Sequence, residues 1–202
     1  QSYGDAVTID SATEATVLNG TNITFFDTLE DGDAAGVENL TINGSGDTEF
    51  QGDIGGAARG GTAEFGNFIT DAPGTVTFGN GTDTTITARA DSFTFNDGVL
   101  LEEDAEIFGV TQTFFQSTIN SADGEFNDLD VTGADVDFRR DIGNNGGPGI
   151  LGSLEVATGA AGTVELGDVL TASTTINVRG DINMDVDDAA NTNVIDTIDG
   201  VG

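Results

Sequence analysis

The hexapeptide Gly74-Thr75-Val76-Thr77-Phe78-Gly79 returns further along the chain as Gly162-Thr163-Val164-Glu165-Leu166-Gly167. These two segments end a longer match, in which residues 50–79 align with residues 138–167 without a gap. Eleven of the 30 aligned positions are identical. Long repeats of short strands and turns are typical of solenoids, in which each coil buries its apolar side against the next coil. The repeat therefore predicts stacked coils.

Short runs of alternating apolar and polar residues occur throughout the chain, for example in Val7-Thr8-Ile9, Leu40-Thr41-Ile42 and Val136-Asp137-Phe138. Their period of two predicts half-buried strands. Turn-forming pairs such as Asn43-Gly44 and Asp97-Gly98 separate the runs, and no amphipathic helix is evident. We predict an all-β protein, a parallel β-helix (β-solenoid) of about eight to nine rungs with roughly 20–25 residues in each. The alternative is a tandem pair of β-sandwiches.

The self-match extends on both sides of the aligned segment. It divides the chain into a first solenoid copy at 1–92, a second copy at 93–182, and residues 183–202, which begin a third copy or form a terminal contact segment. Phenylalanines recur in the strand runs, and we expect them to stack as an aromatic ladder along the core. They are Phe25, Phe26, Phe50, Phe65, Phe78, Phe114, Phe115 and Phe138.

The composition excludes several classes of chemistry. The chain carries 36 Asp and Glu against 5 basic residues, a net charge of −31, and all five bases are arginines. It has no Lys, His, Cys or Trp. A Ser-His-Asp triad, a zinc finger, a disulfide and a lysine Schiff base are therefore impossible. Such an acidic chain repels phosphate backbones, so we expect no nucleic-acid partner, and no run of 18 apolar residues predicts a membrane span.

The sequence of the repeats resembles the β-strand repeats of large bacterial secreted and surface proteins of the filamentous-haemagglutinin and autotransporter-adhesin type. The resemblance rests on Ser2–Ile9, Ile23–Phe26, Leu40–Phe50 and Gly52–Gly55, and on the second copy from Phe93 to Leu101. It implies a parallel β-helix, an extracellular or cell-surface location, and work in adhesion, biofilm or surface fibres. It carries no catalytic residues. The chain is more acidic than this type.

Calcium is the metal that this composition suits best, because Asp-rich turns beside Gly supply oxygen ligands. The segment Gly79–Ile86 is similar to one nonapeptide of a calcium-binding β-roll, although tandem copies are missing. Stacked coils would also bring like carboxylates together, and calcium or high salt would relieve their repulsion. The candidate metal ligands are Asp83, Asp31, Asp33, Asp187 and Asp188. Solvated turns are the simpler interpretation.

A solenoid has two open ends, and contacts between such ends that do not close on themselves build filaments. The terminal strands supply the candidate assembly interface, which comprises Val7, Ile9, Val194, Ile195 and Ile198. We therefore predict an extracellular structural protein, a subunit or segment of a surface fibre, sheath or biofilm filament that assembles head to tail with itself. The first alternative is a calcium-dependent adhesin segment that binds a surface glycan or a host protein.

The second alternative is a polysaccharide-active β-helix enzyme. Asp128, Asp130, Asp135 and Asp137 alternate near one strand pair, and paired carboxylates can cleave glycosidic bonds. Alternation explains the same residues as the solvent face of two strands, so we predict no enzyme and no catalytic residue. Arg89 and Arg179 occupy equivalent positions in the two copies, each two residues before an Asp. We interpret them as surface ion pairs, with a subunit contact as the alternative.

Overall fold

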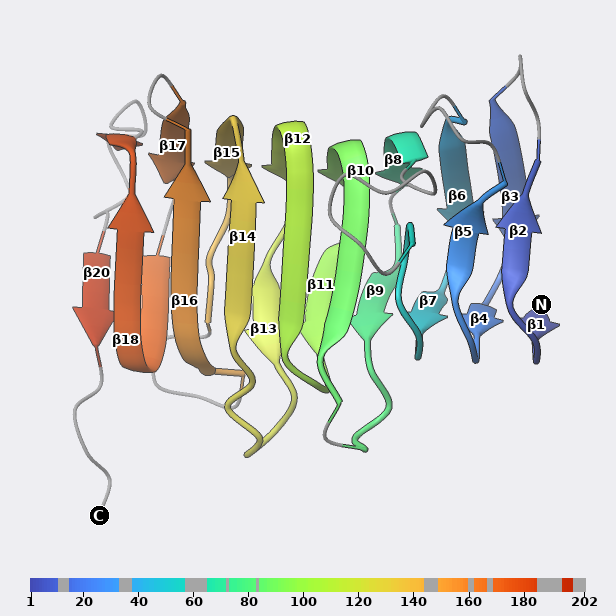
Figure 1. The fold of residues 1–202 in the computed structure, drawn as a ribbon. Coiled ribbons are helices and arrows are strands. Elements are labelled where there is room, and N and C mark those ends of the chain that lie inside the picture. The colour runs from blue at the N-terminus through green and yellow to red at the C-terminus, as the bar shows by residue number, and fades with distance from the viewer. Residues whose placement is uncertain are drawn as a thin grey trace.

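The fold is a β-solenoid whose strands follow one another along a single axis in chain order (Figure 1). The computed structural model describes residues 1–10, 15–32, 38–56, 65–71, 73–82, 84–143, 149–159, 162–166, 169–184 and 194–197. These residues form strands and turns without a helix, and every strand pairing among them is parallel. Parallel pairing excludes tandem antiparallel sandwiches and confirms the predicted solenoid.

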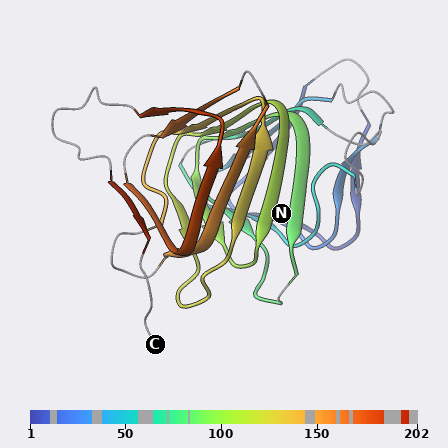
Figure 2. The ribbon, with the colours of Figure 1, turned by 60° about the vertical axis from the view of Figure 1, so that its left-hand side comes forward.

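Each coil contributes strands to three ladders, which are seen from a second side in Figure 2. The first ladder contains β1 (Ser2–Tyr3), β4 (Ile23–Phe25), β7 (Asp47–Phe50), β9 (Thr75–Phe78), β11 (Gly98–Leu101) and β13 (Ile119–Ser121). The second contains β2 (Val7–Ile9), β5 (Leu29–Asp31), the single bridging residue Ile54, the first halves of β10 (Ile86–Phe95) and β12 (Ala105–Phe115), β14 (Leu129–Gly133), β16 (Leu151–Thr158) and β18 (Val169–Arg179).

The third ladder contains β3 (Thr16–Gly20), β6 (Leu40–Gly44), β8 (Phe65–Thr70), the second halves of β10 and β12, β15 (Asp135–Phe138), β17 (Thr163–Leu166) and β19 (Asp181–Met184). The last strand, β20 (Val194–Thr197), pairs with the start of β18. Six coils, from β1 to β15, pass through all three ladders. Two further coils extend the second and third ladders, and the first of them also reaches the first ladder through Ile142, which bridges to Ile119. These eight coils compare with the eight to nine rungs that the sequence predicted.

The coils differ in length. In the first ladder Val99 pairs with Ile119, 20 positions later, whereas Thr48 pairs with Val76, 28 positions later. The strands keep their alignment because the extra residues are placed in the corners between strands. The solenoid therefore tolerates coils of different length.

The two sequence copies are parts of one continuous solenoid. The boundary between residues 92 and 93 falls inside β10. Ile86 and Ile176 are four steps apart in the second ladder, but Phe50 and Phe138, which the repeat aligns, lie in the first and third ladders. The repeat therefore records a recurring strand-and-turn pattern, and the same pattern is used on more than one ladder.

The interior is filled by one side of the strands whose side chains the structure describes. In β6 the residues Leu40 and Ile42 are fully buried, while Thr41 between them is partly exposed. Aromatic rings make a continuous chain of contacts through Tyr3, Phe25, Phe50, Phe78, Phe95, Phe115 and Phe138, with ring centroids 5.0–5.9 Å apart. Each such pair adds about 0.5–1.5 kcal/mol beyond the area that it buries. The expected aromatic ladder is present.

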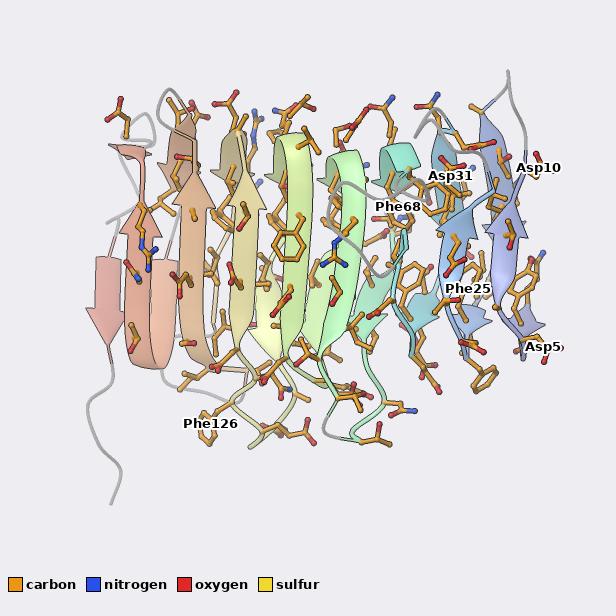
Figure 3. The ribbon with its side chains drawn as sticks, in the orientation of Figure 1. Asp5, Asp10, Phe25, Asp31, Phe68 and Phe126 are labelled. Atoms are coloured by element: carbon orange, nitrogen blue, oxygen red, sulfur yellow. The ribbon has the colours of Figure 1, made fainter. Side chains whose placement is uncertain are left out.

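Two of its expected members lie outside. Phe26 is 50% exposed, and Phe114 lies on the outer face beneath the guanidinium of Arg139. Phe26 follows the inward-pointing Phe25, and Phe114 precedes the inward-pointing Phe115. Successive residues of a strand point to opposite faces, so only one residue of each adjacent pair can enter the core. Figure 3 shows Phe25 and Phe68 among the strands and Phe126 on a loop away from them.

Candidate functional site

A shallow hollow of about 570 Å³ lies on the outer side of the third ladder. The second halves of β10 and β12 form it together with β15 and β17. Its lining is mostly polar, since alternate residues of these strands face away from the core. The lining residues are Thr94, Gln112, Phe114, Gln116, Asp135, Val136, Asp137, Arg139, Thr163 and Glu165.

Arg139 is held in place within this hollow. Its Nε donates a hydrogen bond to Oδ2 of Asp137 at 3.1 Å, and its guanidinium lies 4.5 Å from the ring centre of Phe114. Asp137 is 9% exposed, whereas the side chain of Arg139 is 55% exposed. A planar cation fixed over an aromatic ring keeps donors free for a hydroxyl or carboxylate ligand. The hollow is thus equipped for a polar ligand.

The four aspartates that alternation singled out do not form one cluster. Asp135 and Asp137 line the hollow of the third ladder. Asp128 and Asp130 lie on the second ladder, where they line a smaller hollow of about 220 Å³ with Asp104, Glu106 and Glu155. The polypeptide turns from one ladder to the next between β14 and β15, and this turn separates the two pairs.

Carboxylates stack along the second ladder. The register places Glu106 opposite Asp130 and Asp130 opposite Glu155. Like charges directly opposite one another on parallel strands destabilise the pairing. Arg179 partly offsets this charge, because its Nη2 is 2.6 Å from Oε1 of Glu155.

The two equivalent arginines behave differently. Arg179 makes the surface ion pair that was expected, but with Glu155 of the preceding coil. Arg89 donates a hydrogen bond to the carbonyl of Gly56 at 3.4 Å, and its guanidinium lies 4.8 Å from the ring centre of Phe108. Among the described residues, Arg89 thus contacts a carbonyl and a ring and makes no ion pair.

Of the five predicted metal ligands, the structure describes only Asp31. It ends β5 and is 4% exposed (Figure 3). Asp33, Asp83, Asp187 and Asp188 lie outside the described residues. Within the described ranges, no three carboxylates gather in a way that could hold a metal ion. Calcium at the predicted positions stays a prediction.

The segment resembling a β-roll nonapeptide forms a corner that binds a carboxylate. Oε1 of Glu103 accepts hydrogen bonds from the backbone N–H and hydroxyl of Thr82, and Oε2 accepts one from the hydroxyl of Thr84. The N–H of Asn80 makes a longer bond of 3.4 Å. Burial by itself would raise the pKa of Glu103, but these hydrogen bonds outweigh it and lower the pKa below its usual 4.5.

A second acidic corner was missed by the sequence interpretation, which saw Asp97-Gly98 only as a turn. Asp97 is 4% exposed and lies near Asp71. Burial first, and the charge of Asp71 next, raise the pKa of Asp97 to about 6, although the Thr70 hydroxyl lowers it. No sequence signal marks this pair, because the two residues belong to different coils.

The predicted assembly residues lie in edge strands at opposite ends of the rod (Figure 1). Val7 and Ile9 are in β2, which pairs only with β5 among the described strands, and both side chains are partly buried. Val194 and Ile195 are in β20, where they pair with Val169 and Leu170. Ile198 lies outside the described residues.

No family model, no curated protein and no solved structure matches this chain. Among the described residues no helix has the length and apolar character to cross a membrane. The class of the molecule is a parallel β-solenoid with an acidic outer surface, and its function must be inferred from its own geometry.

Proposed function

We propose that this chain is an extracellular structural protein, a β-solenoid subunit or segment of a surface fibre, sheath or biofilm filament that assembles end to end. The observation that carries the proposal is the open first coil. Its strands β1, β2 and β3 each pair on one side only within the described part of the chain. The extracellular setting rests on the resemblance to secreted and surface repeat proteins.

The interior of the first coil continues the core but is incompletely covered. Tyr3, Val7, Ile9 and Leu18 pack against the core and remain partly exposed, whereas the corresponding residues of the next coil, such as Phe25 and Leu29, are buried. Unpaired strand edges with half-covered apolar side chains favour the addition of another coil. We infer that a further coil of the fibre stacks on this end, for a separate subunit the coil containing β20 of a second copy.

The charge distribution favours association at the ends. Carboxylates follow the outer side of the second ladder, with Glu106, Asp130 and Glu155 in register, and the whole chain has a net charge of −31. Rods lying side by side would bring such rows together, which is repulsive at low ionic strength. An end-on contact that does not close on itself then produces a filament.

Electron microscopy of the purified protein tests this proposal. The variant Val7→Lys places a charge at the open end, and we expect filaments of the unmodified protein to be replaced by short rods. The matched control is Val110→Lys, because Val110 is 58% exposed on the side of the rod and should tolerate the change. Circular dichroism verifies that both variants retain their strands.

Filaments that form equally well from Val7→Lys and from the unmodified chain would overturn the proposal. So would short monodisperse rods of the unmodified protein over a wide range of concentration and salt. Removal of residues 190–202 addresses the opposite end, and it should also abolish assembly.

A second candidate function, glycan binding in an adhesin, is favoured by the hollow around Arg139. Its amides, carboxylates and ring-stacked guanidinium match the hydroxyl groups of a polysaccharide. Arg139→Ala should reduce retention of the protein on immobilised polysaccharide, while Arg179→Ala, on the other ladder, should not. Equal retention of both variants would remove this candidate.

A further inference from the structure

The corner between the third and first ladders holds two acidic residues from successive coils. Asp71 follows β8, and Asp97 lies between β10 and β11. Thr70 pairs with Phe95, so the two strands leave the third ladder side by side. The carbonyl of Thr70 accepts hydrogen bonds from the backbone and side-chain amides of Asn96, which fixes this exit.

Both carboxylates have a buried oxygen that lacks a partner. Oδ1 of Asp71 and Oδ1 of Asp97 are shielded from solvent, and neither is within hydrogen-bonding geometry of a donor in the described part of the chain; the nearby Thr70 hydroxyl, which lowers the pKa of Asp97, also lacks a partner. No arginine among the described residues forms an ion pair with either group. A buried carboxylate oxygen without a partner is costly, and native structures usually supply a hydrogen bond, a water or a cation.

Backbone oxygens approach the same place from the preceding coil. A Cβ atom on Gly74 would lie 2.9 Å from the carbonyl oxygen of Gly44 and 3.1 Å from Oδ1 of Asp97, and closer still to the carbonyl oxygen of Gly46. Three oxygens from two segments, the β6–β7 corner and the corner that contains Asp97, therefore lie within 3.1 Å of one point. Gly74 packs closely against these oxygens, and a side chain at this position would displace them.

We infer that Asp71 and Asp97, together with the carbonyl oxygens of Gly44 and Gly46, hold a calcium ion between successive coils. Carboxylates and carbonyls are the ligands that calcium prefers, and two carboxylates balance its charge. Water completes the irregular shell, a geometry that calcium accepts more readily than magnesium does. The ion would connect three coils, since Gly44 and Gly46 flank the β6–β7 corner, Asp71 follows β8 and Asp97 follows β10.

A proton competes with calcium for the carboxylate of Asp97. Without a cation, the raised pKa of Asp97 leaves this carboxyl protonated below about pH 6, and calcium must displace that proton. Asp71 is the charged group that faces Asp97 and raises this pKa further. Calcium affinity should consequently be about tenfold weaker at pH 5 than at pH 7.5.

Calorimetric titration of the chelator-treated protein with CaCl₂, in a constant high concentration of NaCl, tests the inference. We expect one tight binding event that is weakened at least tenfold by Asp97→Asn and by Asp71→Asn. The control is Asp123→Asn, which removes the same charge from an exposed turn and should leave this event unchanged. The melting temperature should rise with CaCl₂ more than with MgCl₂ or NaCl of equal ionic strength.

Equal calcium affinity in the unmodified protein and in Asp97→Asn would overturn the inference, as would a rise in melting temperature that NaCl reproduces. If Asp97→Asn fails to fold, the calcium affinity of Asp71→Asn decides. An affinity equal to that of the unmodified protein would then reject the site. Filament formation plays no part in these measurements, so the two proposals fail or succeed separately.

Discussion

Glu103 and Thr82 are joined by two hydrogen bonds, because Oε1 of the glutamate accepts the backbone N–H of the threonine at 2.7 Å and its hydroxyl at 2.8 Å. The bonds connect the corner after β9 with the corner after β11, one coil further on. A carboxylate that accepts several hydrogen bonds is stabilised in its charged form. This corner is thus held by a side chain rather than by the ladder alone.

We predict that Glu103→Gln destabilises the solenoid by about 1–3 kcal/mol at neutral pH, since an amide cannot accept all of these bonds. The pKa of Glu103 is lowered in the folded protein, so its stabilising effect is present above the unfolded value and is lost as the pH falls through the folded value. The difference in melting temperature between the two proteins should therefore shrink below about pH 4.5. A difference that persists unchanged in acid would contradict this account.

The neighbouring Glu102 should respond in the opposite direction. Burial first, then the charges of Glu49, Glu125 and Glu103, raise its pKa. Its negative charge therefore costs stability as the pH rises above the unfolded value. We expect Glu102→Gln to stabilise the protein at pH 7 by a few tenths to about 1 kcal/mol, an effect that salt reduces. Thermal melts of Glu102→Gln and of the unmodified protein at low and high salt provide the comparison. A lower melting temperature for Glu102→Gln would refute the prediction.

Much of the fold follows from local sequence patterns. The long internal repeat and the alternation at Leu40 and Ile42 together predict stacked coils, because each strand has one apolar face that must be buried in a shared core. Alternation also settles the orientation of adjacent residues, so that the burial of Phe25 requires the exposure of Phe26. Strict use of this period would have removed Phe26 and Phe114 from the expected aromatic ladder.

The acidic corners could not be predicted in the same way. Asp71 and Asp97 come together only because 25 residues separate paired positions such as Phe68 and Phe93, and other coils are shorter or longer. A small error in coil length changes which corner residues become neighbours. The resemblance of Gly79–Ile86 to a calcium-binding repeat likewise gave no hint that Glu103 of the next coil occupies this corner.

The ring stack should carry a large share of the local stability. Phe115 is 1% exposed and stacks on Phe95 at 5.1 Å and on Phe138 at 5.0 Å. We expect Phe115→Ala to cost about 3–5 kcal/mol, because it leaves a cavity and removes both ring pairs. Phe26→Ala, at a half-exposed ring outside the stack, should cost less than about 0.5 kcal/mol. Similar unfolding midpoints for both variants in denaturant would contradict the role of the stack.

The acidic corner at Asp97 predicts a particular pH dependence in the absence of divalent cations. Its folded pKa of about 6 lies above the ordinary value of 3.8, so the folded state binds a proton more tightly than the unfolded chain does. The contribution of Asp97 to stability is then greatest below about pH 4. It decreases as the pH rises to about 6, by on the order of 2 kcal/mol. In EDTA, Asp97→Asn should remove this component, whereas Asp123→Asn should retain it. Identical pH profiles for both variants would reject the assignment.

Substitutions at the two glycines that follow β9 distinguish the cost of backbone strain from the cost of crowding. Gly79 and Gly81 have φ angles of 95° and 74°, a region that is unfavourable for any other residue, so alanine should be strained at both. A Cβ on Gly79 would also lie 2.5–2.8 Å from Cγ, Cβ and Cδ of Glu103, whereas a Cβ on Gly81 would meet nothing within 4 Å. We expect Gly81→Ala to cost about 1–2 kcal/mol and Gly79→Ala at least about 1 kcal/mol more.

The excess cost of Gly79→Ala should depend on Glu103, since the displaced side chain would lose its hydrogen bonds to Thr82 and Thr84. In a double-mutant cycle, Gly79→Ala should therefore cost less in a Glu103→Ala background than in the unmodified protein, while Gly81→Ala should cost the same in both. Denaturant unfolding followed by circular dichroism measures the four differences. Additive effects of Gly79→Ala and Glu103→Ala would mean that the excess cost of Gly79→Ala does not come from its contact with Glu103.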